Sequence, residues 1–256
     1  MTAALLAEWT KLRTLTSTGW LLLGTAVLTI GVGAAVVAGT HQSSGGGGQD
    51  LTKLALTGID LGQAVVAVLA VLAVAEEYGT GMIRTTLAAM PRRITVLGAK
   101  AAIVAALSLP TGLVAVAGSL VTARLVLHTG GRGAVPAAFG SVVPGPTLRA
   151  AAGSAIYLTL VALLALGIAT AVRDTAVSIG VVLGVLYLPP LLAQAVSDPL
   201  RRHLLQVAPM SAGLTVQATR HLRELPVAPW VGIGVLAAWA AVALLIGGLL
   251  LRFRDA

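Results

Sequence analysis

Few residues of this 256-residue chain could do chemistry. There is no cysteine, which excludes disulfides, cysteine nucleophiles and thiolate metal sites. A phosphate-binding loop needs glycines and a lysine followed by Ser or Thr, but Lys11, Lys53 and Lys100 precede Leu or Ala. Four scattered histidines have no metal-ligand spacing and are expected in loops: His41, His128, His203 and His221. We therefore expect that the chain is not an enzyme and holds no cofactor or metal.

One carboxylate falls beside an apolar run of residues. Asp60 opens this run, and Gln63 follows one turn later. Ionisable residues inside membrane spans often mark the binding sites of ion-coupled carriers. Asp60 lies near the end of its span, however, where a carboxylate at the membrane–water interface is the simpler interpretation.

Composition decides which solvent surrounds these residues. Hydrophobic residues make up 57% of the chain and charged residues 10%, whereas soluble domains carry about 25% charged residues. Such a chain cannot cover a water-exposed surface, so a lipid membrane is the expected environment. The net charge is +8, but the basic residues are scattered among apolar runs. They suit loops near anionic headgroups and do not indicate nucleic-acid binding.

The charge-free stretches predict an all-α integral membrane protein with six transmembrane helices in one domain, 1–256. Each stretch supplies close to the 20 or so residues that cross a bilayer core of about 30 Å. The predicted spans are 19–39, 57–76, 99–122, 150–172, 175–196 and 229–251. Six spans place both termini on one side, but Lys and Arg divide nearly evenly between the sides, so charge alone does not orient the chain.

The connections and spans carry weaker patterns. The fourth and fifth spans are joined only by Arg173 and Asp174. In 197–226, the polar residues Arg201, Arg202 and His203 next to the apolar residues Leu204, Leu205 and Val207 predict a short interfacial helix. Gly180 and Gly184 form a small-xxx-small pair that would allow close helix packing.

The N-terminal segment 1–18 predicts an amphipathic helix. Leu5, Trp9 and Leu12 fall on one helical face, and Trp9 suits the membrane–water boundary. This pattern is typical of a helix lying in the interface. The alternative is a plain extension of the first span.

A second short helix is expected between spans two and three. Gly79 and Gly81 permit a sharp exit from span two, and Pro91 stops the helix that residues 82–90 can form. An apolar face flanked by charges would suit docking of a partner. A solvated loop is the equal alternative on spacing alone.

Several short motifs together resemble bacterial type-2 ABC transporter permeases, especially actinobacterial ones. They run from Ala7 to Thr14 (AEWTKLRT), with Ser17, Thr18 and Trp20 after them, and continue at Glu77-Tyr78, Gly81–Leu87 (GMIRTTL), Pro91–Arg93 and Ala99-Lys100. Arg173 with Thr175-Ala176, and Leu188-Pro189, also fit. The six-span layout covers the whole chain.

The resemblance implies the permease subunit of an ATP-driven exporter in the bacterial cell membrane, with both termini cytoplasmic. The N-terminal segment would be an interfacial helix on the cytoplasmic side (Glu8, Trp9, Lys11, Leu12 and Arg13). The segment after span two would be a coupling helix that docks on an ABC ATPase subunit, formed or supported by Glu77, Tyr78, Gly81, Ile83, Arg84 and Leu87. ATP and Mg would bind that separate ATPase.

Two permease copies, or one copy with a paralogue, would then form the path for a small-molecule, lipid or peptide substrate. The few charges in the spans favour a hydrophobic or amphiphilic substrate. Two other functions remain as alternatives. One is a non-transporting membrane subunit, such as a sensor or assembly factor, and the other is an ion-coupled secondary transporter that uses Asp60 and Gln63.

Overall fold

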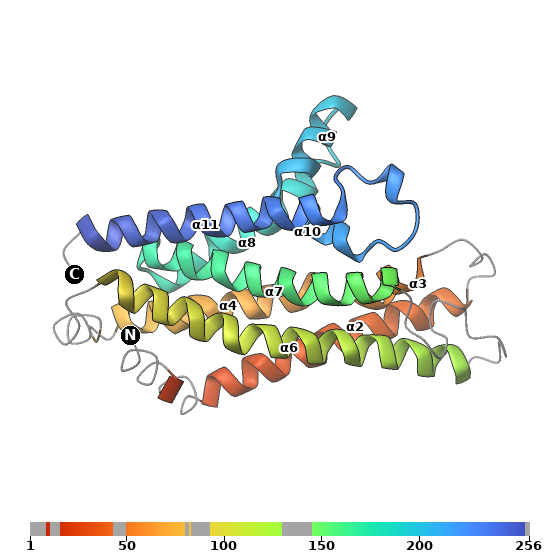
Figure 1. The fold of residues 1–256 in the computed structure, drawn as a ribbon, viewed down its shortest axis with the longest axis horizontal. Helices are drawn as coiled ribbons and strands as arrows, with labels where there is room; N and C mark the ends of the chain where they lie inside the picture. Colours follow the sequence, from red (N-terminus) through yellow and green to blue (C-terminus); the bar gives the residue numbers. More distant parts are fainter. Residues whose placement is uncertain are drawn as a thin grey trace.

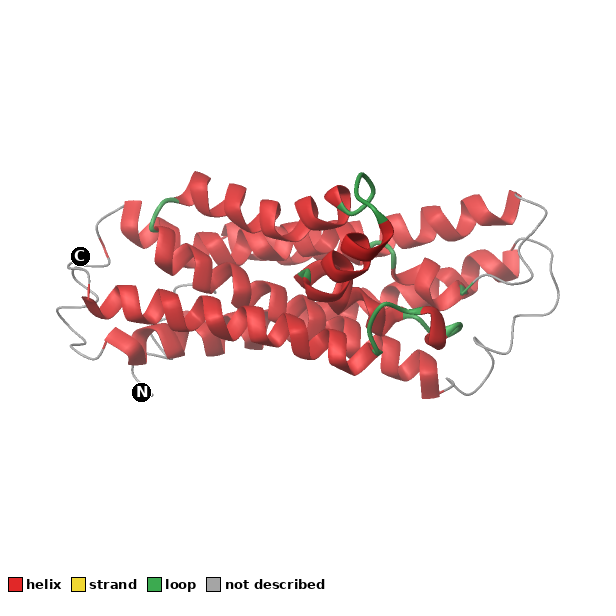
Figure 2. Cartoon of the chain, turned by 90° about the horizontal axis from the view of Figure 1, so that it is seen from above, coloured by secondary structure: helices red, strands yellow, loops and turns green. Residues whose placement is uncertain are grey.

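The computed structural model describes residues 9–10, 16–42, 50–79, 82, 93–129 and 145–253. Within these ranges the chain is helical and contains no strand (Figure 2). Among the described residues, six helices are long and apolar enough to cross a membrane, which confirms the predicted all-α architecture with six candidate spans. They are α2 (Thr16–Gln42), α4 (Ile59–Gly79), α6 (Arg93–Thr129), α7 (Gly145–Val172), α8 (Thr175–Leu192) and α11 (Pro229–Phe253).

The long helices run roughly side by side along one axis (Figure 1). We name the end that holds Gly79, Arg93 and Phe253 the proximal end, and the end that holds Gln42, Thr129 and Gly145 the distal end. Shorter elements connect the long helices: α3 (Leu51–Leu56), α9 (Asp198–Val207), α10 (Pro209–Leu214), η3 (Thr215–Gln217) and η4 (Leu222–Glu224).

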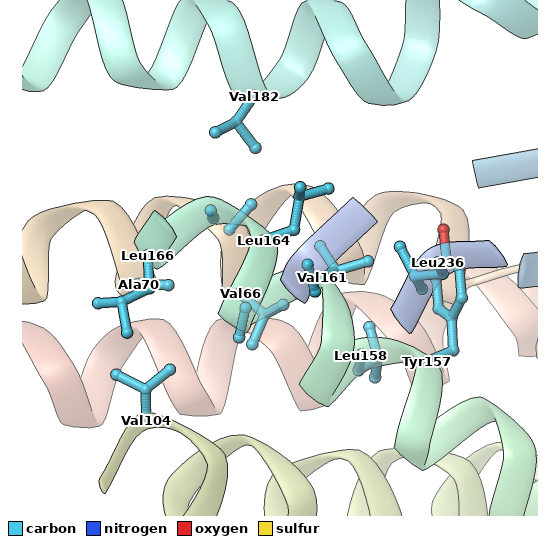
Figure 3. Close-up of a cluster of buried hydrophobic side chains, with 14 of the residues drawn as sticks. Val66, Ala70, Val104, Tyr157, Leu158, Val161, Leu164, Leu166, Val182 and Leu236 are labelled. Atoms are coloured by element: carbon cyan, nitrogen blue, oxygen red, sulfur yellow. The ribbon is translucent and has the colours of Figure 1, made fainter. Parts of the chain in front are cut away.

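Helix α7 is the centre of the bundle. It packs on α4, α6, α8 and α11, while α2 packs on α4 and α6. Tyr157, Leu158, Val161 and Leu164 of α7 are fully or almost fully buried and form one apolar cluster with residues of the neighbouring helices (Figure 3). Outward-facing residues of the other helices, such as Trp20, are exposed and apolar. An apolar core with an apolar surface is the expected arrangement for helices surrounded by lipid.

Side-chain hydroxyls inside the helices mostly bond to their own backbone. Ser108 donates to the Val104 carbonyl at 2.7 Å, and Ser178 donates to the Asp174 carbonyl at 2.5 Å. This satisfies a polar group without any partner from another helix. Ser154 differs, because its buried Oγ has no hydrogen-bond partner in the described structure.

Close helix packing occurs at other glycines than the predicted pair. No described atom lies within 4 Å of a Cβ built on Gly180, and Gly184 meets only Leu188 of its own helix. In contrast, a Cβ on Gly58 would overlap the backbone of Thr29, and one on Gly232 would overlap the Ala212 carbonyl. Glycines with no space for a side chain therefore bring α2 against the α3–α4 turn, and α10 against α11.

Most helices extend beyond the predicted spans, as α6 does by covering 93–129 where the sequence predicts 99–122, and two other boundaries differ in kind. The predicted second span, 57–76, begins at a turn of Thr57 and Gly58 that separates α4 from the additional short helix α3. The fifth helix ends at Leu192, two residues after Pro189 and Pro190, and not at residue 196. Each proline lacks a backbone N–H, so the last turn of α8 has fewer hydrogen bonds to sustain it.

Candidate functional site

A charged layer lies at the proximal end, close to where α4 ends and α6 begins. Lys100 Nζ donates to Glu77 Oε1 at 2.6 Å, and the two side chains are only 4% and 3% exposed. Glu77 lies in the last turns of α4, where the helix dipole disfavours a negative charge. The lysine supplies the compensating charge, so the pair holds the end of α4 against α6.

Arg173 extends this layer to the remaining helices. Its backbone is in the left-handed region (φ 65°) in the short link between α7 and α8, which costs a non-glycine residue about 1 kcal/mol. The guanidinium lies 5.4 Å from the centroid of the Tyr78 ring, and Nη2 donates to the Leu250 carbonyl at 3.2 Å. We name Glu77, Tyr78, Lys100 and Arg173 the proximal layer. It joins the ends of α4, α6, α7 and α11.

The structure places only some of the sequence-predicted site residues. Glu77 and Tyr78 are in the proximal layer, and the Glu77 carboxylate faces Lys100 inside the bundle. Trp9 is helical and 41% exposed. The other predicted residues lie outside the described ranges: Glu8, Lys11, Leu12, Arg13, Gly81, Ile83, Arg84 and Leu87. In the sequence, Lys100 and Arg173 are span boundaries and members of the family motifs. Each is also a lone cation next to a long apolar run, which is a signal that it needs a partner inside the bundle.

A second polar cluster lies inside the bundle, and we name it the middle layer: Asp60, Gln63, Tyr157 and Tyr187. Gln63 is fully buried, and its Oε1 accepts a hydrogen bond from the Tyr157 hydroxyl. The backbone carbonyl of Asp60 accepts from Gln63 Nε2 at 3.2 Å and from the Tyr187 hydroxyl. Tyr157 lies close to the midpoint of α7, so this cluster joins α4, α7 and α8 well inside the bundle.

The Asp60 carboxylate has a different environment from its backbone. It is partly exposed, and within the described part of the chain it accepts no hydrogen bond. Lys53 of α3 is the cation whose charge acts on it. The Tyr187 hydroxyl that bonds to the Asp60 backbone carbonyl comes from a residue five positions before the end of α8. The sequence identified Asp60 and Gln63 but gave no indication of the two tyrosines, which stand in otherwise apolar spans.

The chain returns into the bundle next to the middle layer. After α8 it leaves the bundle as α9, which has no buried residue, and then re-enters as α10 and η3. We name residues 209–217 the return segment. Gly213 packs on the Tyr157 ring, Val216 packs at Gly153, and Ala212 packs at Gly232. Figures 1 and 2 show that these short elements lie partway along the bundle, short of the distal ends of α2 and α6.

A hydrogen-bonded clasp holds the distal side of the return segment. The Asp50 carboxylate accepts from the Thr219 hydroxyl at 2.7 Å and from the backbone N–H groups of Thr219, Arg220 and Lys53. Arg149 Nη2 also donates to the Ala218 carbonyl at 2.7 Å. Partial burial of Asp50 acts to raise its pKa, but the hydrogen bonds led by those from Thr219 outweigh it, and the pKa is lowered from 3.8.

We expect Asp50→Ala to release residues 215–220 and to speed trypsin cleavage after Arg220 by about tenfold or more, since hydrogen bonds to a charged group contribute about 1.5–3 kcal/mol. Because the folded-state pKa is lowered, this stabilisation is present above pH 3.8 and is lost as the pH falls through the lowered value. Timed proteolysis measures the effect. Asp198→Ala on exposed α9 is the matched control, and equal cleavage rates in the two variants would contradict the clasp.

Comparison with known proteins does not assign the chain to a family. In the described ranges, no group of three or more His, Asp or Glu residues is placed to hold a metal ion. Neither a family model nor a curated protein matches the sequence.

Proposed function

We propose that the chain is the membrane-spanning permease subunit of a type-2 ABC exporter, driven by a separate ATPase. The proximal layer carries this proposal. It braces the end of α4 and the start of α6, the two helices that flank residues 80–92, with a buried ion pair and an Arg173–Tyr78 contact. The motif resemblance and the six apolar helices support the same conclusion.

In this proposal residues 80–92 dock on the ATPase in the cytoplasm of a bacterial cell, where both termini also lie. Closure of the ATPase subunits pushes this segment, and the proximal layer passes the displacement to α4, α6, α7 and α11. ATP shifts the permease between two states, because the ATPase binds them with different affinity. A second permease copy or a paralogue completes the path for an amphiphilic substrate.

Co-purification tests this docking. The tagged chain in mild detergent is expected to bring down a stoichiometric ATPase subunit, and Arg84→Glu with Leu87→Asp is expected to abolish the association. Reversed charge and a buried carboxylate at an interface each oppose binding. The matched control is Arg201→Glu with Leu200→Asp on α9, which carries the same changes away from the proximal end. If the ATPase stays bound to the Arg84 and Leu87 variant, the docking assignment is wrong.

A second candidate is an ion-coupled carrier, favoured by the middle layer. Broken or re-entrant helices beside polar residues at membrane depth are a feature of secondary transporters, and the return segment over Tyr157, Gln63 and Asp60 has this arrangement. Substrate uptake into proteoliposomes that needs an ion gradient and no ATPase would favour the carrier over the exporter.

A further inference from the structure

We propose that the middle layer binds the positively charged amine of an amphiphilic substrate, with the Asp60 carboxylate as its counter-charge. This inference rests on the proposed function and names its substrate class. A carboxylate in an apolar environment needs a cation or several hydrogen bonds, and the Asp60 carboxylate accepts no hydrogen bond from the described chain.

The neighbouring groups leave this charge available to a ligand. Tyr187 and Gln63 donate to the backbone carbonyl of Asp60 and not to its carboxylate. The Tyr157 hydroxyl is committed to Gln63. Lys53 is exposed on α3 and acts only through its charge, with no ion pair to Asp60 within 4.0 Å. The polar side chains therefore fix the position of Asp60, while none of the described residues forms a hydrogen bond or an ion pair with its carboxylate.

The exposed surface around Asp60 determines what kind of cation fits. Gln63 and Tyr157 are fully buried, so a ligand approaches from the partly exposed side of Asp60. Leu61, the next residue, is 49% exposed, and Leu188, the residue after Tyr187, is 56% exposed. A hydrocarbon tail can lie on these apolar side chains while a cationic head reaches the carboxylate. An anionic head would be repelled, and a neutral head would gain no charge interaction.

One aromatic ring adds a preference for amines over small metal ions. The Tyr187 hydroxyl donates to the Asp60 backbone carbonyl and Tyr187 is only partly buried, so this ring lies next to residue 60. Alkylammonium groups bind well beside aromatic rings. A metal ion would prefer several oxygen ligands, and the middle layer supplies one carboxylate.

Binding is measured directly on the full-length chain in phosphatidylcholine nanodiscs, with tritiated dodecylamine as the probe and empty nanodiscs subtracted. We expect saturable binding that unlabelled dodecyltrimethylammonium displaces, while dodecanol and dodecyl sulfate at the same membrane concentration do not. Asp60→Asn should weaken binding about tenfold or more, because it removes the counter-charge. Asp60→Glu should retain most of the affinity, and Asp198→Asn should leave it unchanged.

Asp60→Asn is a suitable variant because Gln63 and Tyr187 bond to the backbone carbonyl of residue 60, which the substitution leaves in place. Gel filtration checks that the variant is folded. Equal displacement by dodecanol, unchanged affinity in Asp60→Asn, or no saturable binding to the wild-type chain would each overturn the inference. The assay contains no ATPase. Failure of ATPase co-purification would therefore reject the exporter without affecting the amine site. Absence of saturable amine binding in a chain that still co-purifies with the ATPase would reject the amine site without affecting the exporter.

Discussion

Replacing Lys100 by Met is expected to destabilise the folded chain by roughly 3–5 kcal/mol. The substitution keeps the length and the apolar stem of the side chain but removes the cation 2.6 Å from Glu77 Oε1. The Glu77 carboxylate would then stay in a site that is 3% exposed without its main counter-charge. Unfolding by sodium dodecyl sulfate in mixed micelles, followed by circular dichroism, measures the loss.

A second variant separates the missing charge partner from a simple packing defect. Glu77→Met combined with Lys100→Met removes both charges, and it should recover most of the stability that the single variant loses. Replacement of a buried ion pair by apolar residues is often neutral or stabilising. A Lys100→Met variant as stable as wild type, or a double variant less stable than the single one, would contradict the assignment of the pair.

Gly232→Val is expected to detach the return segment from α11, with a loss of about 3 kcal/mol or more. The Cβ of any side chain at this position would overlap the Ala212 carbonyl and lie 2.5 Å from Thr215 Oγ1. Since the main clash is with backbone, no rotation of a side chain relieves it. Hydrogen exchange of residues 209–217 should rise together with the loss of thermal stability.

Gly234→Val is the matched control for this prediction. Gly234 lies on the same helix, but no described atom lies within 4 Å of its Cβ position. The two variants share the change in helix propensity, which is below about 1 kcal/mol, and differ only in the clash. Equal exchange and equal stability in the two variants would show that α10 does not depend on the contact at Gly232.

The six long helices could be predicted because charges bound the apolar runs. The link Arg173-Asp174 illustrates this, since Asp174 ends one run and caps α8 by accepting from the Val177 backbone N–H at 2.8 Å. The return segment could not be predicted, because residues 209–217 are short and mixed in polarity. Its burial depends on space left by Gly153 and Gly232 in other helices, and no local pattern reports such distant pairs.

The candidate sites could be predicted from the sequence only in part, again because local patterns do not report contacts between distant helices. Asp60 and Glu77 stand out in the sequence as charges beside apolar runs, so both could be identified early. Their contacts could not, because Lys100 and Tyr187 belong to other helices, and which residues meet depends on how those helices pack. For Glu77 the sequence indicates that a buried charge needs compensation, but only the fold shows that Lys100 provides it.

The unequal lengths of the helices have a consequence for where the protein resides in a membrane. Helix α8 has 18 residues and α6 has 37, so their lengths are about 27 Å and about 55 Å. A bilayer that matches α8 leaves α6 to tilt or to project beyond it. In a bilayer with the usual core of about 30 Å, the lipid next to the shorter α8 is instead expected to be compressed. Membranes with shorter acyl chains would relieve this compression, so the protein should gather in the thinner regions of a mixed bilayer.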